Sequence, residues 1–200
     1  GRWGKKDGAS ACPSVHSMIQ HFNDLSGFVI STIIRHPSLD VRNKVLAFWV
    51  ECHRQLWMFN SFDGAVCLTS AFGSVPVRKL LAAHLLEMKS SALRQLESFN
   101  QLFTENRRGY RACVAAALSS QQPCVPYLGF FLTDVTFMLD GNPDTVDASA
   151  AGVPPLINFW KRVMLANHIK TLEQMQTLPY ATLMRASGLY EYLAIAQGYP

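Results

Sequence analysis

Residues 123–143 read PCVPYLGFFLTDVTFMLDGNP, an apolar run with two prolines before it and a turn sequence after it. Pro123 and Pro126 fix φ and disfavour helix at the residues before them, so the run opens with a rigid, extended segment. The apolar residues that follow predict a helix over about 127–139, and the sequence DGNP at 140–143 is a strong signal for its end. The run therefore predicts one helix with well-defined boundaries.

Two faces of this helix differ in chemistry. One is a packing stripe formed by Leu128, Phe131 or Leu132, Val135, and Met138 or Leu139. Small and polar residues form the other face at steps of four, three and four, namely Gly129, Thr133, Thr136 and Asp140. Asp140 stands at the negative end of the helix dipole, where a carboxylate is mildly unfavourable. A residue placed against its local preference suggests a function, and the alternative is that it only forms the turn.

Helical periodicity extends outward on both sides of the run. Before it, helices are predicted from Ser14 or Ser17 to Arg35, over 38–59 and around 65–72, followed by a more polar stretch over 77–118 with breaks near Ser90 and Asn106. The apolar stripe of the segment 38–59 consists of Val45, Trp49, Cys52, Leu56 and Phe59.

After the run, residues 144–153 predict a loose loop. Pro154 and Pro155 then open a helix that ends at Pro179, and a last helix runs to about Gln197. No alternating pattern longer than a few residues predicts a strand. The sequence therefore predicts an all-α fold, with residues 1–200 forming a single helical domain.

The composition excludes several classes of protein. The apolar residues reach 49% and the charged ones only 16%, against about 25% charged in an average domain, so the chain is not disordered. A net charge of +4, with the basic residues scattered in pairs, is too low to indicate a surface that binds nucleic acid. Five cysteines without CxxC spacing suggest reduced thiols, and no signal peptide or spanning helix is evident. We expect a soluble, cytoplasmic protein.

Motifs of the common enzymes and metal proteins are missing from the sequence. It contains no GxxxxGK[ST], GxGxxG or HExxH motif, and its six histidines occur one at a time. Cys52 and His53 are adjacent, so on a helix they point about 100° apart and cannot form a catalytic pair. The ordinary interpretation is that Cys52 is core and His53 is solvated. We expect no cofactor and no metal site.

Several segments resemble the catalytic domain of Ras-type guanine-nucleotide exchange factors, the RasGEF domain. The run at 123–143 matches that family's hairpin signature almost position for position, and LINFWKR at 156–162 and QMQTLPY at 174–180 continue the match. Upstream matches are HFNDLSGFV at 21–29, FNSFD at 59–63 and SVPVRKL at 74–80. The resemblance implies an all-α domain with a protruding helical hairpin, made of the helix at 127–139 and a partner from Pro155 onward.

The resemblance also implies a function without covalent chemistry. In the family the hairpin wedges open the nucleotide site of a small GTPase, and GTP, GDP and Mg²⁺ are bound by that partner. Asp140 matches the tip carboxylate near Mg²⁺ and the phosphates, Thr136 matches the residue that presses on the phosphate-binding region, and Thr133 and Tyr127 match further hairpin contacts. Positions used around the second switch of the GTPase match Arg42, Asn60, Tyr110 and Tyr180.

The sequence departs from the family pattern at several places. Asp140 stands where the family most often has Glu, FNSFD replaces LNNFN at 59–63, and Gly109 replaces a larger polar residue. Further N-terminal helix is usual in the family, so we expect a fragment of a longer protein, N-terminally incomplete as a RasGEF domain and recruited to membranes through its other domains.

Two other functions stay open. The departures at 60–63 suggest a non-catalytic scaffold that keeps the fold and binds another protein. An unrelated helical enzyme would need a titratable pair in a cleft, which the sequence does not offer. The low charge further predicts a sizeable exposed apolar patch beside the hairpin.

Overall fold

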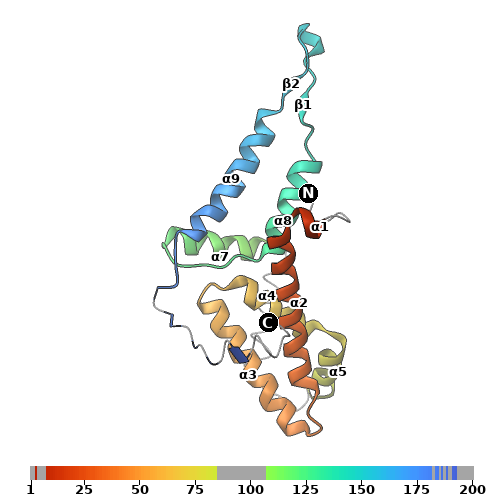
Figure 1. Ribbon diagram of the computed structural model, residues 1–200, viewed down its shortest axis with the longest axis vertical. Helices are drawn as coiled ribbons and strands as arrows, with labels where there is room; N and C mark the ends of the chain where they lie inside the picture. The colour runs from red at the N-terminus through yellow and green to blue at the C-terminus, as the bar shows by residue number, and fades with distance from the viewer. Residues whose placement is uncertain are drawn as a thin grey trace.

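The computed structural model describes residues 3, 8–84 and 107–181, together with single positions at 183, 184, 186, 188, 191 and 192. Within this part of the chain the molecule consists of a helical body and a helical hairpin that projects from it (Figure 1). The only sheet among these residues is a two-stranded ribbon near the hairpin tip. The predicted all-α fold with a protruding hairpin is confirmed. The predicted breaks near Ser90 and Asn106 and most of the last predicted helix lie outside the described residues.

The body is built from the N-terminal helices, whose boundaries follow local signals. Pro13 occupies the first turn of α2 and Pro76 the first turn of α5, positions where the missing N–H costs no hydrogen bond. Pro37 separates α2 from α3. The helices are α1 (Gly8–Ala11), α2 (Pro13–Ile34), α3 (Leu39–Met58), α4 (Phe62–Gly73) and α5 (Val75–His84).

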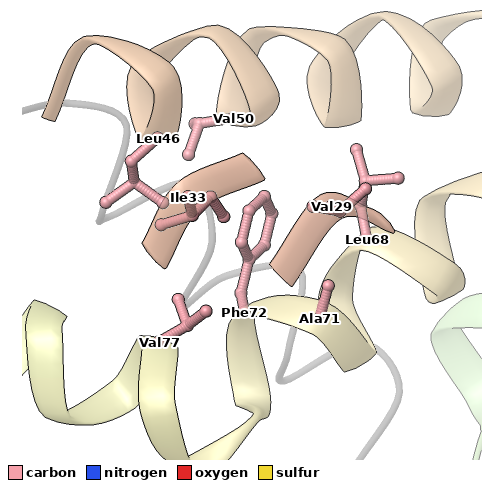
Figure 2. Close-up of a cluster of buried hydrophobic side chains, with 8 residues drawn as sticks. All are labelled: Val29, Ile33, Leu46, Val50, Leu68, Ala71, Phe72 and Val77. Carbon is pink, nitrogen blue, oxygen red and sulfur yellow. The ribbon is translucent and has the colours of Figure 1, made fainter. Parts of the chain in front are cut away.

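One hydrophobic cluster holds these helices together. Figure 2 shows side chains from α2, α3, α4 and α5 pointing toward one another around the ring of Phe72. Its members are Val29, Ile33, Leu46, Val50, Leu68, Ala71, Phe72 and Val77. Because four helices contribute, the body has a core of its own that does not involve the hairpin.

The fully buried residues of α3 lie one position after the residues predicted for its apolar stripe. Leu46, Val50 and His53 are buried, whereas the predicted Cys52 is only half-buried and Phe59 is 46% exposed. The assignment of His53 to solvent was therefore wrong, whereas Cys52 packs against the core cluster, as predicted, while being only partly buried. Hydropathy alone places histidine outside a core, but here the Nε2 atom of His53 finds a hydrogen-bond partner inside the protein.

His53 is bound to α4 across the helix interface. Its Nε2 lies 3.0 Å from the hydroxyl of Thr69, and that hydroxyl donates its own proton to the carbonyl of Ala65 at 3.0 Å. Thr69 must therefore accept from His53, which places the imidazole proton on Nε2. Burial lowers the pKa of His53 from 6.5 to about 4 because the charged imidazolium loses its hydration.

Stability is expected to depend on pH through this residue. Between pH 6.5 and pH 4 the unfolded chain binds a proton at His53 that the folded chain does not, so stability falls as the pH falls. From pH 7 to pH 5 the free energy of unfolding should drop by about 2 kcal/mol. Urea titrations at the two pH values measure this, and the His53→Gln variant should show a correspondingly flatter profile. An equal slope in both proteins would contradict the assignment.

The hairpin consists of α8 (Leu128–Asp140) and α9 (Phe159–Gln176), and α7 (Arg108–Ser119) crosses beneath it (Figure 1). The helix predicted over 127–139 is thus confirmed to within one residue at each end. Leu178 and Pro179 follow α9 outside the helix, as predicted for its end.

The connection between the two hairpin helices was predicted incorrectly. Pro154 and Pro155 do not open a helix, and the loop before them is not entirely loose. Instead β1 (Thr145–Val146) pairs antiparallel with β2 (Leu156–Ile157), and a 3-10 turn at Ser149–Ala151 lies between the two strands. α9 begins only at Phe159, because the side chain of Asn158 accepts a hydrogen bond from the Lys161 amide at 3.1 Å and caps the helix there.

Candidate functional site: the helical hairpin and its base

A second hydrophobic cluster forms the base of the hairpin. A row of aromatic rings in contact links the helical body to the hairpin. Phe62 lies 5.2 Å from Trp57 and 5.5 Å from Tyr110, and Tyr110 lies 5.1 Å from Phe130 of α8, each pair close to edge-to-face. The buried members are Phe62, Tyr110, Val114, Ala117, Cys124 and Met175. The hairpin is therefore anchored on a packed core and does not hang from a flexible linker.

Tyr110 fixes the start of α8. Its hydroxyl accepts a hydrogen bond from the backbone N–H of Tyr127 at 2.9 Å, immediately before the first helical residue. Burial raises the pKa of Tyr110, so the hydroxyl stays neutral. Only 7% of the Tyr110 residue is exposed, which makes it a support for the hairpin in this structure. The direct GTPase contact expected for it stays a prediction.

The position of the Tyr127 ring explains why residue 129, on the face of α8 formed by small and polar residues, is a glycine. A Cβ added to Gly129 would lie 2.5 to 2.8 Å from atoms of the Tyr127 ring, closer than real side chains approach. The Tyr127 ring also lies 4.9 Å from Phe130 and 5.6 Å from Phe22 of α2. The small residue at 129 therefore serves internal packing at the hairpin base.

Asn60 and Tyr180 join three segments that are distant in sequence. Asn60 has φ 55°, its carbonyl accepts from Val125 N at 3.0 Å, and its side-chain amide donates to Pro123 O at 3.2 Å. The Tyr180 hydroxyl donates to Phe59 O at 2.6 Å. Burial raises the pKa of Tyr180 to about 12, so this donor keeps its proton. The end of α3 is thereby tied to both ends of the hairpin.

The remaining predicted residues lie along α8 or apart from it. Asp140 is the last residue of α8 and is exposed. The hydroxyls of Thr133 and Thr136 donate to carbonyls one turn back, at 2.6 and 3.0 Å. Arg42, in the first turn of α3, donates to the His36 carbonyl. The junction of α2 and α3 lies at the end of the body away from the hairpin (Figure 1). The structure thus groups the hairpin residues and leaves Arg42 distant from them.

An ion pair that the sequence analysis missed braces α8 against α7. Asp134 contacts Arg107 at 3.3 Å and Arg111 at 3.0 Å, and the Arg107 guanidinium lies 4.3 Å from the centre of the Phe130 ring. The available signal was an acid inside an otherwise apolar helix, with arginines on both sides of Tyr110. The Asp134 side chain is 18% exposed and has two cationic partners, so the two ion pairs tie α8 to the start of α7.

A mainly apolar cavity of about 620 Å³ is lined by residues of α7, α8 and α9. His168 of α9 lies stacked on Phe131 of α8, with ring centres 4.0 Å apart. The other lining residues include Leu118, Phe137 and Met138. The stacked rings of Phe131 and His168 thus connect α8 and α9 at this cavity.

Four large apolar side chains of the hairpin are highly exposed, and the apolar patch expected beside the hairpin stays a prediction. Phe137 of α8, Ile157 of β2, and Phe159 and Trp160 of α9 are 67% to 74% exposed. Where such side chains form one continuous surface, they are typical of a site that binds another protein.

The described residues offer no group of three His, Cys, Asp or Glu side chains placed to hold a metal ion. Among the same residues, no helix combines the length and the apolar character needed to cross a bilayer. All five cysteines are free thiols.

Comparison with known proteins agrees with this architecture. The model of the RasGEF domain matches residues 1–163, which include the body, α8 and the start of α9. The chain belongs to the RasGEF domain family. The resemblance inferred from the motifs at 123–143 and elsewhere is thereby confirmed.

Individual relatives of this RasGEF domain carry exchange-factor names. It is 31% identical over 173 residues to "Ras guanine nucleotide exchange factor S" of Dictyostelium discoideum, covering 84% of this chain and 16% of that protein. Identity to "Ras guanine nucleotide exchange factor B" of the same organism is 29%, covering 94% and 12%. Identity to human "Rap guanine nucleotide exchange factor 1" is 28%, covering 89% and 15%. The chain therefore spans less than a fifth of the length of these relatives.

Proposed function

We propose that this RasGEF domain accelerates nucleotide release from a small GTPase of the Ras family, in which we include Rap and Ral. The observation that carries the proposal is the projecting hairpin, whose first helix, α8, ends in an exposed acid and rests on a buried aromatic base. The names of the relatives, which cite Ras and Rap, support this class of partner.

The hairpin would act by occupying the nucleotide site from its edge. Asp140 would bring a negative charge toward the phosphates and compete with them for Mg²⁺, and this opposition is strong where water is excluded. Thr136 lies one turn below Asp140 and would press on the phosphate-binding region. No proton transfer or covalent intermediate is needed.

The energetics follow from linkage. A protein that binds the empty GTPase more tightly than the loaded one must weaken nucleotide binding by the same factor. The exposed apolar side chains Phe137, Phe159 and Trp160 offer the binding energy, because burying them against the partner removes apolar surface from water. We further propose that the protein works at a membrane to which other domains recruit it.

A non-catalytic scaffold is the second candidate. The observation that favours it is that all four residues expected around the second switch are engaged in hydrogen bonds inside the domain, namely Arg42, Asn60, Tyr110 and Tyr180. If these bonds persist in a complex, fewer groups remain for the GTPase. A stable complex with nucleotide-free GTPase would argue against the scaffold.

The test is the release of a fluorescent guanine nucleotide from purified Ras, Rap and Ral proteins. We expect release from at least one of them to accelerate in proportion to the concentration of this protein. The control uses the same GTPases with excess free nucleotide and no exchange factor. Absence of acceleration with every Ras, Rap and Ral protein tested would rule out the proposed activity.

A further inference from the structure

Lys161, in the first turn of α9, reaches across the hairpin to the end of α8. Its Nζ donates to the carbonyls of Leu139 and Asn142, both at 2.7 Å, and lies 3.1 Å from the carboxylate of Asp144. Only 4% of the residue is exposed, although it is a lysine close to the tip of a projecting element. Lysine is almost never this buried without full pairing, so the site is built around a cation.

The cage formed by Leu139 O, Asn142 O and the Asp144 carboxylate satisfies all three protons of the ammonium group. The Leu139 carbonyl is one of the last carbonyls of α8, which have no partner within the helix. A positive charge at this end also interacts favourably with the helix dipole. The pKa of Asp144 is lowered, chiefly by its hydrogen bond to Lys161, which is consistent with the pairing.

The two caged carbonyls flank Asp140 and Gly141, so the cage fixes the backbone that carries the Asp140 carboxylate. Gly141 fits this turn because a Cβ would lie 2.7 Å from the Phe137 carbonyl oxygen. Side-chain amides add two further ties, from Asn142 to Met138 O at 3.0 Å and from Asn158 to Pro143 O at 2.9 Å. Within the part of the chain that the structure describes, Lys161 is the only charged residue of this network that is buried.

We propose that Lys161 is a positioning residue for nucleotide exchange, whose ammonium group locks the end of α8 to the start of α9 and aims Asp140. The proposal rests on the proposed function, since it assigns Lys161 a role through Asp140. It does not require Lys161 to touch the GTPase, and its burial argues against such contact. A misplacement of about 1 Å at a reacting group can cost roughly 100-fold in rate.

The test compares Lys161→Met with the control Arg162→Met. Arg162 donates to the same Asp144 carboxylate at 2.9 Å but is exposed and contacts no caged carbonyl. We expect Lys161→Met to slow exchange roughly 10- to 100-fold, and Arg162→Met to stay within about twofold. In an Asp140→Ala background, Lys161→Met should add little further slowing, because the two residues act as a unit.

Hydrogen exchange of the Gly141 amide gives a readout that does not depend on activity. This amide donates to Phe137 O at 2.9 Å. Its protection should fall in Lys161→Met and stay unchanged in Arg162→Met. If Lys161→Met fails to fold, Asp144→Asn offers a second variant, because it alters the one exposed acceptor of the cage. It should lower both the hydrogen-exchange protection of the Gly141 amide and the rate of nucleotide exchange.

The outcomes separate the two proposals. Equal exchange by the Lys161→Met and Arg162→Met variants, or full additivity with Asp140→Ala, would overturn the role of Lys161. If the parent protein releases nucleotide from no GTPase, the proposed function fails. Unchanged Gly141 protection in Lys161→Met would overturn the cage itself, whether or not the parent is active.

Discussion

An Asp140→Ala variant is expected to release nucleotide from the partner GTPase roughly 100-fold more slowly than the parent, with an unchanged melting temperature. Asp140 is exposed at the end of α8 and makes no side-chain contact that the fold depends on. At 4 Å and an effective dielectric constant of about 20, two unit charges interact by about 4 kcal/mol, and about 2.7 kcal/mol corresponds to 100-fold in rate. Stopped-flow release of a fluorescent nucleotide measures the effect.

Two further variants make this result specific. Asp147→Ala removes another exposed acid between β1 and β2 and should leave exchange unchanged, because its carboxylate bonds the local residue Ser149, whose amide donates to it at 2.9 Å. Asp140→Glu lengthens the tip acid by one methylene and should restore or raise the rate relative to Asp140→Ala. If Asp140→Ala exchanges as fast as the parent while Tm is preserved, the carboxylate does not have the role proposed for it.

Features encoded by neighbouring residues could be predicted from the sequence. The limits of α8 follow from Pro126 before it and Gly141 after it, so that helix was located to within one residue. The start of α9 was misplaced because it depends on Asn158, whose amide also bonds the chain fifteen residues earlier, and on the pairing of β1 with β2. Such non-local pairing leaves little trace in a short apolar run.

The same distinction applies to the site. Thr133, Thr136 and Asp140 were identified because one helix face displays them in sequence. Asn60 and Tyr180 were expected at the GTPase surface, but each bonds a backbone carbonyl that lies 63 or 121 residues away in sequence. His53 was assigned to solvent because its partner Thr69 belongs to another helix. Polar residues in a core can be predicted only when the groups that satisfy them are known.

Phe62→Ala is expected to lower the free energy of unfolding by about 4 kcal/mol, the largest effect on stability among these predictions. Phe62 is 1% exposed and packs between Trp57 and Tyr110, so truncation leaves a cavity at the junction of the body and the hairpin. Its backbone N–H also donates to Val125 O at 2.9 Å, which places the cavity directly beneath the segment that enters α8. Urea unfolding followed by circular dichroism measures the loss.

The matched control for this substitution is Phe48→Ala on α3. Phe48 is 60% exposed, so the same chemical change should cost less than about 1 kcal/mol. Loss of the Phe62 ring should also loosen Tyr110, whose hydroxyl accepts a hydrogen bond from the Tyr127 amide. Hydrogen exchange of the Tyr127 amide should therefore accelerate more than that of the Val50 amide in the body core. Equal destabilisation by the two substitutions would mean that the hairpin base is not a core of its own. A larger loss at Phe62, with the acceleration concentrated at Tyr127, would mean that the rigidity of the hairpin arises from this aromatic cluster, because the body cluster of α2 to α5 makes no use of it.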